Sequence, residues 1–86
     1  MAIMDIITDE MVERAVNSIP TKNFNTLHFI EKLIELEFEA VDEVKNWSSR
    51  NWRGLIGKAL KRYSVETNKI DQISPSDESP ARWRKR

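Results

Sequence analysis

Residues 69–86 read KIDQISPSDESPARWRKR, and this stretch decides between an all-helical chain and one that ends in a β-hairpin. Its middle holds two prolines with serines and acidic residues between them, which is a strong turn signal. After the turn, Ala81, Trp83 and Lys85 fall on one face of a strand, and the arginines that alternate with them fall on the other. The pattern predicts an antiparallel hairpin over residues 69–84, with Trp83 packed inward.

The strand before the turn has one irregularity. Ile70 and Ile73 are three positions apart, which is the spacing of a helix rather than of a strand. We expect this strand either to contain a bulge or to bury only one of the two isoleucines.

Residues 50–63, just before the hairpin, carry the strongest helical periodicity of the chain. The apolar residues that recur there at the spacing of one buried helix face are Trp52, Leu55, Ile56, Ala59, Leu60 and Tyr63. Ser48 and Ser49 are candidate N-caps for this helix. Gly54 and Gly57 lie on the opposite face, where each costs a helix roughly 1 kcal/mol relative to alanine. Two such glycines make sense if a partner must approach the backbone closely.

Two further helices are predicted upstream. The first covers residues 9–19, with Thr8 as its N-cap and Pro20 as its stop. A connector, TKNFNT, follows at residues 21–26, and within it Asn25 can cap the second helix. The buried stripe expected on that second helix consists of Leu27, Ile30, Leu33 and Ile34, with Phe38 as an optional fifth member. The fold class predicted is therefore α+β and mostly helical, a three-helix core followed by a C-terminal β-hairpin.

The end of the second helix is open. Residues 37–48 have a helix-forming composition, but they contain no glycine or proline that would end a helix. They either continue the second helix or form a separate element.

Composition points to one small domain that spans residues 1–86. The hydrophobic fraction is 40%, which suffices for a single core, and residues 1–7 form an N-terminal arm that either is flexible or packs against that core. The chain has no cysteine, which excludes disulfides and thiolate metal sites. No stretch approaches the roughly 20 apolar residues of a membrane span, and the first residues lack a basic signal region. We expect a soluble, unprocessed protein of the cytoplasm.

The charges are divided along the chain, although the formal net charge is zero. Up to Glu43 there are ten acidic and three basic residues, and from Val44 onward there are four acidic and eleven basic residues. Such a division indicates an anionic partner for the basic half, or two halves that neutralise each other across the fold.

Three helices, the last amphipathic and basic, followed by a hairpin with a basic final strand, resemble the winged helix-turn-helix superfamily. The resemblance covers the chain from Thr8 onward and is architectural. It implies that the helix SRNWRGLIGKALKRYS reads the major groove of DNA, and that the wing, from KIDQIS through PSDESP to ARWRKR, touches the backbone or the minor groove. Two departures are the long stretch from Glu37 to Trp47 and the acidic pair Asp77 and Glu78 at the wing tip.

Seven basic residues form the candidate DNA-binding set: Arg50, Arg53, Lys58, Lys61, Arg82, Arg84 and Arg86. We expect Trp52, Tyr63 and Trp83 to belong to the core rather than to stack on bases, because each lies on the apolar side of its element. We expect the third-helix basics and the wing arginines to share one positive surface, from which the acidic residues of the first half face away.

No catalytic constellation is apparent. The segment GLIGK lacks the first glycine and the following hydroxyl residue of a phosphate-binding loop. His28 is the only histidine, so zinc is not expected, and the acidic ladder of Glu31, Glu35 and Glu39 is expected to be a solvated helix face. We therefore expect no enzyme, no metal and no cofactor.

The alternative to double-stranded DNA as the partner is a protein. The same fold then serves as an interaction module or a homodimer. Its contact surface is either the acidic second helix or the apolar N-terminus with Met1, Ile3 and Met4.

Overall fold

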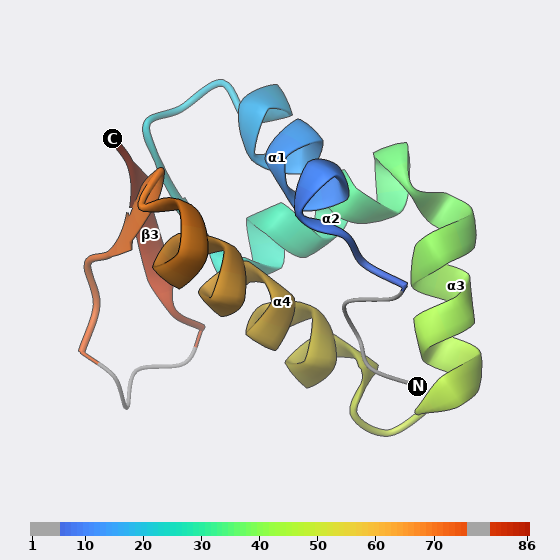
Figure 1. Cartoon of the computed structure of the whole chain (residues 1–86). Helices are drawn as coiled ribbons and strands as arrows, with labels where there is room; N and C mark the ends of the chain where they lie inside the picture. The colour runs from blue at the N-terminus through green and yellow to red at the C-terminus, as the bar shows by residue number, and fades with distance from the viewer. Residues whose placement is uncertain (1–5, 76–79) are drawn as a thin grey trace.

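The computed structural model describes residues 6–75 and 80–86, which form four helices and a small antiparallel sheet (Figure 1). In chain order the elements are α1 (Asp9–Ser18), β1 (Asn23–Asn25), α2 (Thr26–Leu36), α3 (Phe38–Trp47), α4 (Trp52–Thr67), β2 (Ile70–Gln72) and β3 (Arg82–Lys85). The predicted class, α+β and mostly helical with a C-terminal hairpin, is confirmed. The core contains four helices rather than three.

The extra helix, α3, decides whether residues 37–48 continue the second helix or form a separate element. The α2 helix ends at Leu36, and Glu37 leaves helical geometry with φ −128° and ψ 50° before α3 begins. The Glu37 carboxylate contacts the Arg14 guanidinium at 2.6 Å, which ties this corner to α1. The segment is therefore a separate element, and α3 lies on the opposite side of the molecule from β3 (Figure 1).

The helix starts were predicted with mixed success. Thr8 Oγ1 accepts a hydrogen bond from the Met11 amide, and Asn25 Oδ1 accepts one from the His28 amide, so both predicted N-caps are confirmed. The α4 helix begins later than expected, at Trp52, with Asn51 in the capping position and no side-chain capping bond. Ser48 and Ser49 are not its caps, because α3 runs as far as Trp47 and a turn follows.

The sheet contains a strand that the sequence did not predict. Its order is β1-β3-β2, with β3 antiparallel to both neighbours, so β1 pairs with a strand more than fifty residues away in the chain. In the register, Phe24 lies opposite Trp83, and Trp83 lies opposite Gln72. Residues 21–26 are thus more than a connector.

The hairpin was predicted correctly in its pairing and in its irregularity. Ile70 is buried, whereas Ile73 is 42% exposed, so the first strand buries only one of its two isoleucines. Trp83 is buried between the exposed Arg82 and Arg84, as the alternation predicted. The acidic pair Asp77 and Glu78 lies outside the described residues.

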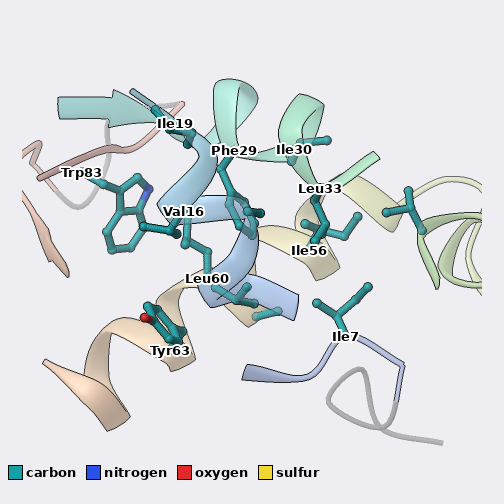
Figure 2. Close-up of a cluster of buried hydrophobic side chains, with 14 of the residues drawn as sticks. Ile7, Val16, Ile19, Phe29, Ile30, Leu33, Ile56, Leu60, Tyr63 and Trp83 are labelled. Atoms are coloured by element: carbon teal, nitrogen blue, oxygen red, sulfur yellow. The ribbon is translucent and has the colours of Figure 1, made fainter. Parts of the chain in front are cut away.

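One apolar core joins the helices to the inner face of the sheet. Figure 2 shows Phe29, Leu33, Ile56 and Leu60 in its centre, with Trp83 on the sheet side and Ile7 on the opposite side. Ile6 and Ile7 are buried, so this part of the N-terminal arm packs against the core; Met1, Ile3 and Met4 lie outside the described residues. Within residues 6–75 and 80–86, no helix combines the length and apolar content that a membrane crossing requires.

Two positions of the predicted stripe on the second helix are wrong, Leu27 and Phe38, and Phe38 is 64% exposed at the start of α3. Leu27 is 50% exposed, because the turn of α2 that carries it faces an open hollow beside α4. Trp52, at the first position of α4, is only partly buried, but it packs against the core as predicted.

Candidate nucleic-acid interface

The exposed side of α4 is basic because its apolar side is fully used by the core. Ile56, Leu60 and Tyr63 are buried on one face, which leaves Lys58 and Lys61 exposed on the other. No acidic residue occurs along α4 before Glu66, in its last turn. All the charged residues of α4 before Glu66 are therefore basic.

Arg50 and Arg53 extend this surface at the start of the helix. Arg50 is exposed in the turn before α4, rather than on the helix as predicted. The Arg53 guanidinium carbon lies 4.7 Å from the centre of the Trp52 ring, and Lys45 Nζ of α3 lies 4.6 Å from it. Trp52 thus holds two cations near the N-terminal end of α4 by cation–π attraction.

The α4 helix is joined to the hairpin along β2. Lys61 Nζ donates to Gln72 Oε1 at 3.1 Å, and Ser64 Oγ donates to the Ile70 carbonyl at 2.8 Å. β2 is an edge strand of the sheet, and it is the strand that packs beside α4.

The outer face of the sheet carries the hairpin arginines. Arg82 is paired in register with Asn25, and Arg84 with Asn23, so arginines on the central strand lie beside asparagines on β1. Trp83 between them points inward, where its Nε1 donates to Thr26 Oγ1 at 2.9 Å. This hydrogen bond and the buried ring fix the direction in which both arginines point.

The third predicted wing residue, Arg86, is engaged by a carboxylate. Its Nε and Nη2 donate to the two oxygens of Asp71, each at 2.7 Å. Hydrogen bonding from Arg86, with smaller contributions from the charges of Arg86 and Arg84, holds the pKa of the Asp71 carboxyl below its usual value. The same contact raises the pKa of Arg86, which is charged in either case.

The predicted site residues lie in two groups. Arg50, Arg53, Lys58 and Lys61 lie on or beside α4, and Arg82, Arg84 and Arg86 lie on the outer face of β3 or at its end. Asp71, which sequence analysis did not single out, lies on β2 between these groups. The polar–apolar–polar pattern of Asn23, Phe24 and Asn25 was the available signal for β1 and its asparagines.

A scan against protein-family models and searches of curated proteins and of solved structures found no match to this chain. Its function is accordingly inferred from its own geometry.

An apolar hollow separates α2 from the first half of α4. Leu27 and Ile30 line one side, and Gly54 and Gly57 line the other. Next to it, Glu31 and Arg53 line a second hollow together with Ile30, so one acidic residue of the first half faces the basic region instead of facing away.

The fold itself does not require either glycine of α4. A Cβ on Gly57 would lie 3.7 Å from Thr26 Cγ2, an ordinary contact, and one on Gly54 would approach only the flexible side chain of Asn51. Side chains of the described residues leave the space beside them open.

A polar cluster on the opposite side of α4 connects three elements. Glu13 of α1 accepts hydrogen bonds from the Tyr63 hydroxyl, at 3.2 Å, and from Lys69 Nζ. Burial, and then the charge of Glu13, raise the pKa of Tyr63 to about 12. Hydrogen bonds from Lys69 and Tyr63 lower the pKa of Glu13.

Within the part of the chain that the structure describes, no group of three or more acidic or histidine residues is placed to hold a metal ion. His28 lies in the first turn of α2, where its amide is capped by Asn25. The exposed Glu31 and Glu35 belong to α2, and Glu39 belongs to α3, so they do not form one continuous ladder.

Proposed function

We propose that this chain is a non-enzymatic, winged-helix-like protein that binds double-stranded DNA, with α4 in the major groove and the hairpin against the backbone. The observation that carries the proposal is the exposed side of α4, where Lys58 and Lys61 are joined by Arg50 and Arg53 and no carboxylate intervenes along the helix before Glu66. A surplus of Lys and Arg on one surface is the main source of affinity for phosphates.

The order of the elements also supports this proposal. An amphipathic basic helix is followed directly by a hairpin that packs beside it, and the helix points its apolar side inward. An α-helix with its side chains is about 10–12 Å across, which is close to the roughly 12 Å width of the major groove. Gly54 and Gly57 narrow α4 on the side of the hollow and would ease such an approach.

The proposal is tested by Lys58→Glu in a fluorescence anisotropy titration of a labelled duplex at two salt concentrations. Lys58 is exposed and points away from the core, so the variant should fold as the parent does. We expect its affinity to fall by about tenfold or more, because a like charge facing a phosphate is strongly unfavourable.

The matched control is Lys32→Glu, which makes the same charge change on α2 instead of on α4 or the hairpin. Its affinity should stay close to that of the parent. No binding by the parent at low salt, or equal weakening by both variants, would contradict DNA binding through α4.

A protein partner is the second candidate, and a specific observation favours it. Phe38 is 64% exposed at the start of α3, and Leu36 and Trp47 are each about half exposed. Apolar side chains of this size on a small domain fit a protein contact. Rising salt discriminates between the two, because it weakens phosphate binding steeply and leaves an apolar contact largely intact.

A further inference from the structure

Asp71 lies where the two basic parts of the surface meet. The sheet order β1-β3-β2 puts β2 between the arginine-bearing β3 and α4, whose Lys61 bonds to Gln72. Asp71 is paired in register with Arg84, so both side chains are on the outer face of the sheet. A carboxylate therefore lies on the strand between the basic residues of α4 and the arginines of β3.

The carboxylate engages its neighbours closely. Arg86 makes a two-pronged contact with both oxygens of Asp71 at 2.7 Å, and Arg84 lies directly across the strand pair. An arginine presents the same fork to a phosphate as to a carboxylate. Asp71 thus occupies the donors that a phosphate would need.

The fold has little need of this ion pair. The side chains of Arg86 and Asp71 are 55% and 46% exposed, and ion pairs as exposed as this one contribute little to stability. Backbone pairing already holds β2 against β3, and Ile70 anchors the strand in the core. Loss of the carboxylate would therefore change the electrostatic potential at the surface much more than the free energy of unfolding.

We propose that Asp71 restrains the affinity of this surface for nucleic-acid phosphates by competing with them for Arg84 and Arg86. This inference rests on the proposed DNA-binding function and assigns a regulator of its strength. In the parent chain the α4 cations then make most of the contacts with phosphate, and Arg84 and Arg86 contribute weakly. Without the carboxylate, one continuous basic surface runs from α4 to the end of β3.

The test is Asp71→Asn, which keeps the shape and removes the charge. In the same duplex titration we expect about fivefold to tenfold tighter binding at low salt, and a plot of log affinity against log salt that is steeper by about one to two, because one or two more phosphates are neutralised. The melting temperature should stay within a few degrees of the parent value.

The matched control is Glu35→Gln in the last turn of α2. It also removes one negative charge and releases one cation, since Glu35 pairs with Lys32 at 3.6 Å. This turn is at the end of α2 that is farther from β1 in the chain, so the affinity should not change. A third variant, Arg84→Gln with Arg86→Gln in the Asp71→Asn background, should lose the gain.

The outcomes separate the two proposals. If the parent binds the duplex and Asp71→Asn binds no better than Glu35→Gln, the restraint is refuted and DNA binding stands. If only Asp71→Asn binds, the restraint is supported and the parent is not a DNA-binding protein under these conditions. If neither binds, both proposals are overturned.

Discussion

Trp83 is the residue on which the hairpin depends most. Its ring is buried in the core, and its Nε1 donates to Thr26 Oγ1, which ties β3 to the start of α2. Thr26 also uses its amide and its hydroxyl to bond to the carbonyl of Ala81. One indole thus links strand, helix and core at a single point.

We predict that Trp83→Ala lowers the free energy of unfolding by about 3–5 kcal/mol, whereas Trp52→Ala lowers it by only about 1–2 kcal/mol. The difference follows from burial, because Trp83 is 2% exposed, whereas Trp52 is only partly buried against the core and contacts the cations Lys45 and Arg53. Urea unfolding of both variants measures it.

A milder substitution at the same position keeps the prediction testable if Trp83→Ala does not fold. Trp83→Phe keeps an apolar ring and removes the bond to Thr26, so it should lower the free energy of unfolding by about 1–2 kcal/mol. If the two alanine variants lower the free energy of unfolding equally, Trp83 on the sheet side of the core stabilises the fold no more than Trp52 at the start of α4.

At the scale of elements, α4 carries two glycines that its own fold does not need. Both lie in its first two turns, and both face the hollow beside α2. The helix therefore gives up intrinsic stability on the side where its backbone is most accessible.

We predict that Gly57→Ala raises the free energy of unfolding by about 0.5–1 kcal/mol, because the new methyl group meets Thr26 Cγ2 at an ordinary 3.7 Å and the helix propensity improves. Gly54→Ala should gain less, since its methyl group requires Asn51 Oδ1 to move from 2.7 Å. Thermal and urea unfolding measure both. A destabilised Gly57→Ala would mean that this side of α4 is packed more tightly than the contact distance implies.

The elements differ in how far they could be predicted. The α4 helix and the β2–β3 hairpin each carry their own periodicity, and the N-caps Thr8 and Asn25 act within one turn, so all of these follow from local sequence. The three-residue strand β1 does not, because its pairing partner is β3, far along the chain. The break at Glu37 has no glycine or proline signal, and its contact with Arg14 is tertiary.

At the scale of the whole molecule, a polar cluster holds three elements together. Glu13 of α1 accepts hydrogen bonds from Tyr63 of α4 and from Lys69, which precedes β2. Because Tyr63 is buried beside a carboxylate, its neutral form is favoured and its pKa rises from 10.0 to about 12.

We predict that global stability falls as the pH rises from about 10 to about 12. In this window the unfolded chain has lost the phenol proton and the folded chain still holds it, so the loss amounts to at most about 2–3 kcal/mol. Urea unfolding across this range measures it, and the phenolate absorbance of the only tyrosine reports the pKa directly.

Two variants test the cause. Tyr63→Phe should abolish this part of the alkaline loss; if the variant loses as much stability as the parent, Tyr63 is not its source. Glu13→Gln should lower the pKa of Tyr63 only part of the way to 10.0, because burial is the larger cause. Since the folded pKa of Glu13 is lowered, its contribution is present above about pH 4.5 and is lost as the pH falls further.

The candidate site, like the fold, could be predicted from the sequence only in part. Sequence alone determined the apolar faces of α4 and β3, and hence that Lys58, Lys61, Arg82 and Arg84 are exposed, because periodicity records which side of an element avoids water. Only the tertiary structure decided that β2 lies between β3 and α4, that Asp71 is bound by Arg86 beside Arg84, and that Glu31 shares a hollow with Arg53. These contacts depend on which elements pack together. Elements that are far apart along the chain can pack side by side, and no local pattern in the sequence records that they do.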